Sequence, residues 1–334
     1  MRVGVIGVGN MGRNHVRVYS MIDGVDLVGV ADISEERAKV VASAYGTEAF
    51  TDFRDLLRRD LDTVSIAVPT SKHRDVAVVA ADFGVHMLIE KPIADSLAAA
   101  DEIIKAAERS DVKVMVGHIE RFNPAVVKLN EVISRGEIGE ILTMSSKRLG
   151  PFPPAIRDVG VILDLAVHDI DIISYLYGRE VENVYVIAGN SFHMEEDYAS
   201  IMLKYGENKA GIVETNWLTP RKIRTLFVVG TSGVAYLKYI EQELEIWKEE
   251  GVIKENVARR EPLMNEIESF LKCISSGKEP RPSAEEGKYV LAVAIASIIS
   301  YKEGKEVEVR SIYDDKTDAK LDPSPLSTPS SLNT

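Results

Sequence analysis

The segment that most constrains the fold is a glycine-rich turn between a strand-like run and a helical run. The β-branched residues 2–6 are followed by Gly7-Val8-Gly9-Asn10-Met11-Gly12, and residues 13–22 have the character of a helix. A second apolar run, Val25–Ala31, ends at Asp32, twenty residues beyond Gly12. A strand, a G-x-G-x-x-G turn, a helix and an acidic residue at this distance predict a βαβ unit that binds a dinucleotide.

Each part of this unit has a role in binding such a cofactor. The glycines permit the tight turn and the approach of a pyrophosphate to the helix N-terminus, and Asp32 is placed to bond the adenosine ribose. Because an acidic side chain repels a 2′-phosphate, the sequence favours NAD over NADP. The alternative for Asp32 is a helix cap that competes with Ser34. With the segments described next, the predicted cofactor-binding residues are Gly7, Gly9, Asn10, Met11, Gly12, Asp32, Pro69, Thr70, His73, Glu90 and Lys91.

Strand-like and helical runs continue to alternate as far as residue 117. Helices are predicted over 35–45, 52–59, 73–83 and 97–109, and apolar strands over 63–68, 85–89 and 113–117. This alternation indicates an α/β domain with a doubly wound parallel sheet, which we place in residues 1–120. Ligands of such sheets lie at the carboxyl ends of strands. The segments at those ends are 69–73, Glu90-Lys91-Pro92 and 118–124, where Arg121 and Asn123 are expected to reach a polar ligand.

An apolar helix predicted over residues 159–176 carries one polar stripe. Asp164, His168 and Asp171 stand at i, i+4 and i+7, so in an α-helix they project within about 40° of one another. Two carboxylates and an imidazole on an otherwise apolar helix are costly to bury without partners. The stripe is therefore either a hydrogen-bonded core network or the wall of a reactive cleft. A metal site is not expected, because no cluster of His and Cys ligands is nearby.

The second half of the chain, residues 121–313, predicts a different sheet. Runs of period two predict antiparallel strands with one solvated face over 140–148, 181–189, 198–205, 210–217, 224–229, 233–239 and 243–247. Helices are expected over 123–135, 261–276 and 284–302, with an edge strand at 307–309. A sheet covered on one side often pairs with another copy, so we expect a homodimer or homotetramer. The Pro/Ser/Thr-rich residues 314–334 are expected to form a disordered tail.

Composition limits the classes of partner. The 334 residues suffice for two domains, and 52 acidic against 40 basic residues give a net charge of −12. This charge argues against a nucleic-acid or anionic-membrane partner. No apolar run approaches the roughly 20 residues of a membrane span, and the N-terminus has no targeting signal. Cys273, the only cysteine, is expected in the core and excludes an intrachain disulfide. We expect a cytoplasmic protein.

Four motifs together resemble those of the Gfo/Idh/MocA family of oxidoreductases. They are the glycine turn with Asp32, Ala67-Val68-Pro69-Thr70 with His73, Glu90-Lys91-Pro92, and Asp164-x-x-x-His168-x-x-Asp171. The resemblance extends to residue 310. It implies a Rossmann domain, a second α/β domain with a large open, mostly antiparallel sheet, and NAD(P)-dependent chemistry at a CH–OH carbon of a sugar or polyol. It also implies that Lys91 is the catalytic lysine, Pro92 a cis-proline, Asp164 a substrate-orienting carboxylate and His168 the acid/base histidine.

The chemistry of this oxidation accounts for the residue types. A hydride leaves the carbon only as the hydroxyl proton is lost, so a base must lie within hydrogen-bond reach. A neutral His168 can take that proton near pH 7, and Lys91 as an ammonium can stabilise the developing alkoxide or help to relay the proton. Asp164 and Asp171 are expected to orient the imidazole and hold adjacent hydroxyls. The sequence leaves open which of Lys91 and His168 is the formal base.

Two further segments, 118–125 and 148–160, resemble the branch of the family that acts on UDP-linked amino sugars. This implies oxidation of C3 of UDP-N-acetylglucosamine or a related sugar, whose keto product a partner aminotransferase would use. Lys147, Arg148, Arg157, Arg221, Lys222 and Arg224 flank the proposed cleft and would bind the diphosphate, or else form a solvated basic face. The predicted substrate-binding residues are Arg121, Asn123, Arg148, Arg157, Asp164, His168 and Asp171. The alternatives are an inositol or free-aldose dehydrogenase, an NAD-dependent glycosidase, and a non-catalytic sugar or NAD sensor.

Overall fold

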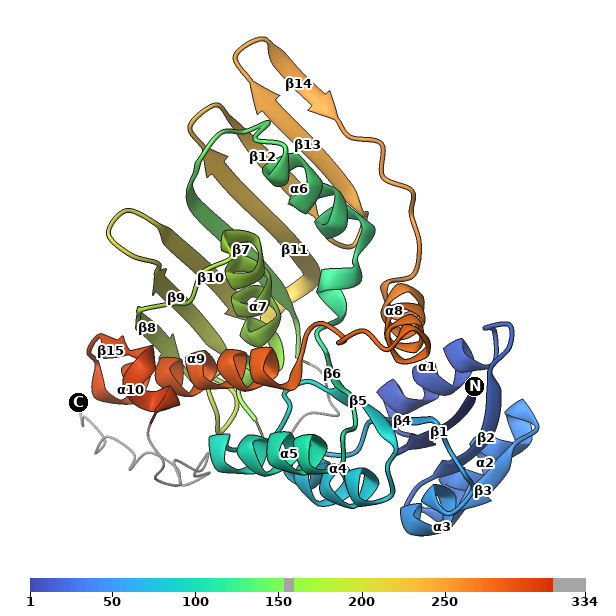
Figure 1. Ribbon diagram of the computed structural model, residues 1–334. Helices are drawn as coiled ribbons and strands as arrows, with labels where there is room; N and C mark the ends of the chain where they lie inside the picture. Colours follow the sequence, from blue (N-terminus) through green and yellow to red (C-terminus); the bar gives the residue numbers. More distant parts are fainter. Residues whose placement is uncertain (153–158, 315–334) are drawn as a thin grey trace.

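The computed structural model describes residues 1–152 and 159–314, which build two sheets (Figure 1). The first sheet has six parallel strands in the order β3-β2-β1-β4-β5-β6. This order, with its reversal between β1 and β4, is that of a dinucleotide-binding sheet and confirms the predicted fold. Its elements are β1 (Arg2–Ile6), α1 (Asn10–Tyr19), β2 (Asp26–Ala31), α2 (Glu35–Tyr45), β3 (Glu48–Phe50), α3 (Phe53–Leu57), β4 (Thr63–Ile66), η1 (Thr70–Lys72), α4 (His73–Asp82), β5 (His86–Glu90), α5 (Leu97–Arg109) and β6 (Val114–Gly117).

The second sheet has nine strands in the order β14-β13-β12-β11-β7-β10-β9-β8-β15. Only β7 and β10 pair in parallel, so the sheet is mostly antiparallel, as expected. The sequence did not predict the short strands β3 and β14. The strands are β7 (Ile141–Pro151), β8 (Asn183–Gly189), β9 (Tyr198–Lys204), β10 (Ala210–Asn216), β11 (Leu218–Gly230), β12 (Gly233–Lys238), β13 (Glu243–Lys248), β14 (Gly251–Lys254) and β15 (Val307–Glu308).

Helices cover one face of this second sheet. Figure 1 shows α6 (Pro124–Ser134), α7 (Val167–Tyr177) and α9 (Ala284–Glu303) over that face, and no helix of the described residues lies over the other. Burial follows the pleat: along β9 every second residue is buried and the residues between are exposed. The remaining elements are η2 (Ile119–Phe122), η3 (Ile162–Ala166), α8 (Pro262–Ser276) and α10 (Val309–Tyr313).

Two late helices return to the first sheet. Helix α8 packs on α1, and its Leu263, Ile267 and Phe270 belong to the same core as strands β1 and β2. Helix α9 packs on α5 and β6, next to the point where the Val116 N–H donates to the Pro282 carbonyl at 3.0 Å. The strands of the first sheet end with β6 and those of the second begin with β7, while helices α8 and α9 also pack against the first sheet and its helices.

The predicted site helix is not one regular α-helix. It begins as the π-helical turn η3 and becomes the α-helix α7 at Val167. A π turn has more residues per turn than an α turn, so Asp164 does not share one regular stripe with His168 and Asp171.

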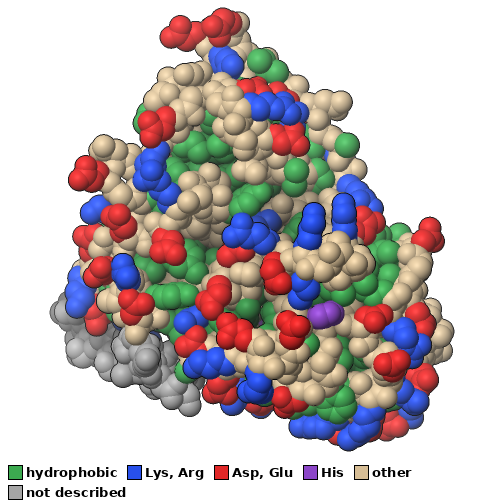
Figure 2. Space-filling model, viewed as in Figure 1, with side chains coloured by type: hydrophobic (Ala, Val, Ile, Leu, Met, Phe, Trp, Pro, Cys, Tyr) green, Lys and Arg blue, Asp and Glu red, His purple; other side chains and the backbone are tan. Residues whose placement is uncertain are grey.

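The surface of the molecule carries charges of both signs. On the face shown in Figure 2, acidic and basic side chains are interspersed, and no extended basic patch is visible. Cys273, expected in the core, is only half-buried on α8. No helix of the described residues has both the length and the apolar character needed to cross a membrane. The predicted tail falls on residues 315–334, outside the described residues.

Candidate active site

The glycine turn has the shape of a dinucleotide cradle. A Cβ on Gly12 would lie 1.8 Å from the Gly7 carbonyl oxygen, whereas a Cβ on Gly9 would meet nothing within 4 Å. The backbone at Gly7 has a φ of 84°, which favours glycine. Helix α1 begins at Asn10 with no side-chain cap and no acidic residue in its first turn. Its free N–H groups and positive dipole end therefore suit a pyrophosphate, and the residues fit the cofactor that the motif predicts.

Asp32 closes the other side of this cradle. Its buried carboxylate accepts the Val8 N–H and the Ser34 N–H, each at 2.9 Å. Ser34 caps α2, so the alternative role of Asp32 as the cap of that helix is not observed. Arg37, which the sequence analysis did not single out, donates to both carboxylate oxygens at 3.2 Å. The adenosine end of the site therefore contains a negative and a positive side chain.

Lys91 follows β5 and begins a loop that contacts with His73 hold in place. The Lys91–Pro92 peptide is cis, as the resemblance implied. The buried ring of His73 has Nδ1 3.0 Å from the Pro92 carbonyl oxygen and Nε2 3.0 Å from the Val68 carbonyl oxygen. His73 thus ties the loop to the end of β4. Pro69 and Thr70 lie between these points, at the start of η1.

Lys91, which follows β5, forms an ion pair with Asp164 of η3. The Lys91 ammonium donates to the Asp164 carbonyl oxygen at 2.7 Å and to the Asp164 carboxylate at 3.2 Å. Both side chains retain some exposure, 17% for Lys91 and 15% for Asp164. An ammonium has three donors, so one N–H of Lys91 remains for a bound group. Residues from two distant motifs therefore form a partly open polar site.

His168 lies next to this pair in a cationic environment. Burial, followed by the charges of Lys91, Arg148 and Arg224, holds the pKa of the His168 imidazole well below its ordinary value. The ring is therefore neutral at pH 7 and able to accept a proton. Its buried Nδ1 has no hydrogen-bond partner among the described residues.

The expected orientation of His168 by two carboxylates is not observed. Asp164 is occupied by Lys91, and the buried Asp171 accepts hydrogen bonds from Arg121, the shortest of them 2.6 Å long. The departure from a regular α-helix at η3 separates Asp164 from the stripe of His168 and Asp171, and Arg121 engages Asp171.

Three residues predicted to touch substrate belong instead to the buried frame of the site. Arg148 is 1% exposed and pairs with Asp169 at 2.7 Å and with Glu120 at 2.9 Å. Arg121 also pairs with Glu286, and Asn123 caps α6 by accepting the Ala125 N–H at 3.1 Å. Their hydrogen-bonding groups are engaged within the protein, so we do not carry them into the proposed substrate site. Arg157 lies outside the described residues.

Arg224 is placed differently. It lies opposite Arg148 in the pairing of β11 with β7, and its nearest carboxylate oxygen, on Glu120, is 3.9 Å away. Burial and the charge of Arg148 lower the pKa of the Arg224 guanidinium, which indicates incomplete compensation of its charge. Lys147 pairs with Glu214 at 2.9 Å and is half exposed. Two members of the predicted basic set, Arg148 and Arg224, act on the charge of His168; Arg148 is closely paired within the protein, whereas Arg224 is not.

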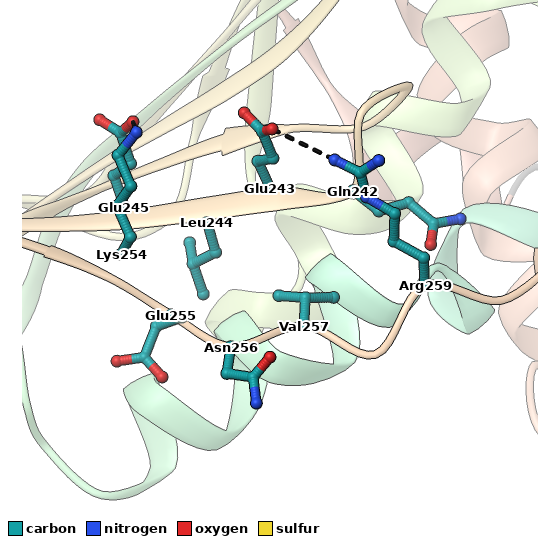
Figure 3. Close-up of a pocket in the computed structure, with 9 residues that line it drawn as sticks. All are labelled: Gln242, Glu243, Leu244, Glu245, Lys254, Glu255, Asn256, Val257 and Arg259. Carbon is teal, nitrogen blue, oxygen red and sulfur yellow. Dashed lines mark hydrogen bonds and ion pairs between the residues drawn. The ribbon is translucent and has the colours of Figure 1, made fainter.

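Two surface pockets of the described residues lie away from Lys91, Asp164 and His168; the second is lined in part by Arg121 and Glu286. The pocket in Figure 3, about 240 Å³, is lined by residues 242–245, 254–257 and 259. A second, about 520 Å³, lies between the end of α7 and the start of α9. Lys91, Asp164 and His168 line neither pocket. Within the described residues, no group of three or more His, Cys, Asp or Glu side chains is arranged to hold a metal ion.

Comparison with known proteins agrees with this geometry. Residues 1–118 match the Gfo/Idh/MocA family model described as an oxidoreductase family with an NAD-binding Rossmann fold, and residues 126–236 match the family's C-terminal domain. The chain belongs to the Gfo/Idh/MocA family of oxidoreductases. The predicted family, the Rossmann domain and the oxidoreductase class are therefore confirmed.

Individual relatives extend the match over nearly the whole chain. The UDP-N-acetylglucosamine 3-dehydrogenase of Acidithiobacillus ferrooxidans is 32% identical, over 88% of this chain and 95% of that protein. Its solved structure superposes with a TM-score of 0.85 at 31% identity, covering 91% of this chain and 98% of that one. The scyllo-inositol 2-dehydrogenase (NAD(+)) of Bacillus subtilis is 30% identical over 92% of this chain and 96% of that protein.

Proposed function

We propose that this protein is an NAD-dependent dehydrogenase that oxidises a sugar CH–OH group to a ketone, at C3 of UDP-N-acetylglucosamine or a related UDP-amino sugar. The observation that carries the proposal is the Lys91–Asp164 pair beside a neutral His168. Lys91 follows β5 of a sheet whose glycine turn fits a dinucleotide. Similarity to the Acidithiobacillus enzyme supports the choice of sugar.

We assign a separate role in the reaction to each of His168, Lys91 and Asp164. When bound, NAD supplies the acceptor for the hydride. His168, neutral and partly buried, takes the hydroxyl proton as the general base. The remaining N–H of Lys91 donates to the same oxygen and stabilises its developing negative charge. Asp164 fixes the direction of Lys91 and offers its carboxylate to a neighbouring hydroxyl.

Arg224 supports a nucleotide-sugar substrate. No carboxylate closely neutralises the positive charge of Arg224 among the described residues, and Arg224 lies on the same strand pair as Arg148. Its charge also lowers the pKa of His168. A diphosphate needs such a cation, whereas a free inositol does not. The competing proposal, an inositol dehydrogenase, is favoured by the comparable identity to the Bacillus enzyme. If the UDP-sugar is the substrate, the keto product is suited to a partner aminotransferase.

The preferred cofactor is proposed to be NAD. Asp32 is buried at the position that bonds the ribose hydroxyls, and its charge disfavours a 2′-phosphate. In Asp32→Ser, Arg37 loses its carboxylate partner and becomes available to a phosphate. We expect the ratio of kcat/KM for NADP to that for NAD to rise by about tenfold or more. A ratio unchanged by this substitution would contradict the assignment of Asp32.

The test of the function is the appearance of NADH absorbance with UDP-N-acetylglucosamine, myo-inositol and glucose in parallel. The spectrum of the purified protein is recorded first, to detect retained NADH. We expect signal with the UDP-sugar, lost in Lys91→Met and His168→Asn and kept in Lys105→Met, an exposed lysine of α5. Signal with free polyols alone would assign the inositol function. No signal with any sugar, despite cofactor binding, would refute the proposal and favour a glycosidase or a sensor.

A further inference from the structure

Four polar side chains of the first domain form a buried chain that ends at the residue before Lys91. The Tyr19 hydroxyl lies 2.9 Å from Ser65 Oγ, which lies 2.9 Å from His15 Nδ1. His15 Nε2 lies 2.8 Å from Glu90 Oε1. Tyr19, Ser65 and His15 are all 0% exposed. Polar groups are buried in this way only when they are hydrogen-bonded, and the reaction described above gives these four no role.

The direction of the His15–Glu90 hydrogen bond follows from the charge of Glu90. Burial raises the pKa of its carboxyl, but the hydrogen bond and charge of His15, together with the charge of Lys91, outweigh burial and hold it below the ordinary value. Glu90 is therefore an acceptor, and His15 donates from Nε2. Ser65 Oγ lies between His15 Nδ1 and the Tyr19 hydroxyl, so each side chain of the chain has a hydrogen-bond partner.

Besides His15, the Lys91 backbone and Gly117 restrict the position of the Glu90 carboxylate. Its second oxygen accepts the backbone N–H of Lys91 at 3.3 Å. A Cβ on Gly117 would lie 3.3 Å from the carboxylate carbon and from both oxygens, which is tighter than ordinary van der Waals contact. The carboxylate is thus confined between α1, the Lys91 backbone and the end of β6.

We propose that His15 is a positioning residue for Lys91. It connects helix α1, whose first turn forms the cofactor cradle, through Glu90 to the Lys91 backbone, and Lys91 in turn contacts Asp164. Helix α1 therefore helps to position both the cofactor, which accepts the hydride, and Lys91, which acts in proton transfer. A displacement of about 1 Å in such a site lowers the rate by as much as 100-fold. This role rests on the proposed function.

The test compares His15→Leu with His15→Gln, whose amide can donate to Glu90. Arg17→Ala is the matched control, because Arg17 lies on the same helix and pairs with Glu261 at the surface. We expect kcat to fall roughly 10- to 100-fold in His15→Leu, with the KM for NAD changed less than about threefold. His15→Gln should recover most of the loss, and Arg17→Ala should match the wild type.

A pH profile separates positioning from a general loss of stability. Without the His15 hydrogen bond, burial raises the pKa of Glu90, so the acid limb of kcat should move to higher pH in His15→Leu and not in His15→Gln. The charged or titratable groups around Glu90 are His15, Lys91, His73 and, from α8, Glu266. If His15→Leu does not fold, Gly117→Ala displaces the same carboxylate from β6 and should lower kcat with little change in KM.

Crystal structures of the NAD complexes supply a readout that needs no substrate. In His15→Leu, the Glu90 carboxylate should move and Lys91 should lose its contact with Asp164. If the wild type oxidises no sugar, the proposed function fails, and these structures still decide the role of His15. A folded His15→Leu with wild-type kcat, or with Lys91 unmoved, would overturn the inference.

Discussion

His168 lies among three cations, and this arrangement fixes its charge. Burial and then Lys91, Arg148 and Arg224 lower its pKa, so the acid limb of kcat/KM for sugar oxidation should lie below about pH 6.5, the ordinary value for histidine. Arg224→Met removes one positive charge and should move that limb to higher pH. Lys147→Met, one residue from Arg148 and paired with Glu214, is the control. Equal profiles for wild type and Arg224→Met would contradict this account.

Glu266 is a second residue whose protonation depends on its surroundings. It is 0% exposed, and neither carboxylate oxygen has a hydrogen-bond partner among the described residues. Burial, and then the charges of Glu90 and Asp171, raise its pKa well above the ordinary value. The folded state therefore holds this proton more tightly than the unfolded state, so the stability that Glu266 contributes at low pH is lost as the pH rises.

Glu266→Gln removes this pH dependence. Urea unfolding between about pH 5 and pH 8 should show the variant gaining stability relative to the wild type as the pH rises. Glu268→Gln, on the same helix but partly exposed and paired with Arg260, serves as the control. A difference between wild type and Glu266→Gln that is constant over this range would show that Glu266 is ionised in the folded protein.

The sequence identified the candidate catalytic residues more readily than the buried residues that surround and position them. Lys91, Asp164 and His168 lie in motifs whose spacing is visible, and the structure brings Lys91 and Asp164 into contact. His15 and Glu266 occupy ordinary helical positions, and their burial depends on contacts with distant segments. Arg148 has the same sequence signature whether it faces a ligand or a buried Asp169. The folded structure is needed to show that Arg148 pairs with Asp169.

At the scale of elements, the start of the site helix depends on one carboxylate. Glu196 accepts the Ile162 N–H at 3.1 Å, and its own backbone carbonyl accepts the Val161 N–H at 2.9 Å. Glu196→Ala should cost about 1 kcal/mol of unfolding free energy, as for other lost helix caps. It should also lower kcat, because Asp164 lies in the turn that Glu196 holds. Chemical denaturation and kinetics of Glu196→Ala beside Glu195→Ala would check both effects, and equal behaviour of the two variants would refute them.

Element prediction failed where local pattern carries little information. The apolar run over 159–176 predicted a helix, and a helix is present, but the π turn at Ile162–Ala166 has no signature in periodicity alone. Strands β3 and β14 have three and four residues, too few to show an alternation of period two. The longer strands and helices were recognised because their periodicity persists over several residues, and the four-residue strands β4 and β6 were recognised because they lie in continuous apolar runs.

At the scale of the whole molecule, the face of the second sheet that the helices do not cover carries a row of apolar side chains, interrupted by Ser145. Tyr185, Met202 and Ile212 are cross-strand neighbours on β8, β9 and β10, and each is at least 40% exposed. The row continues across Ser145 to Phe227 and Tyr236 on β11 and β12. Contiguous exposed apolar side chains can mark an interaction surface.

We expect the partner of this face to be a second copy of the chain, because two such sheets would bury their apolar rows against each other in one symmetric contact. We expect light scattering after size-exclusion chromatography to give the mass of a dimer or tetramer. Met202→Glu, which puts a charge at the centre of the row, should shift the protein toward monomer. Val40→Glu, on the exposed face of α2, should leave the mass unchanged. A wild-type monomer at micromolar concentration, or an oligomer unaffected by Met202→Glu, would show that the sheet face does not mediate assembly.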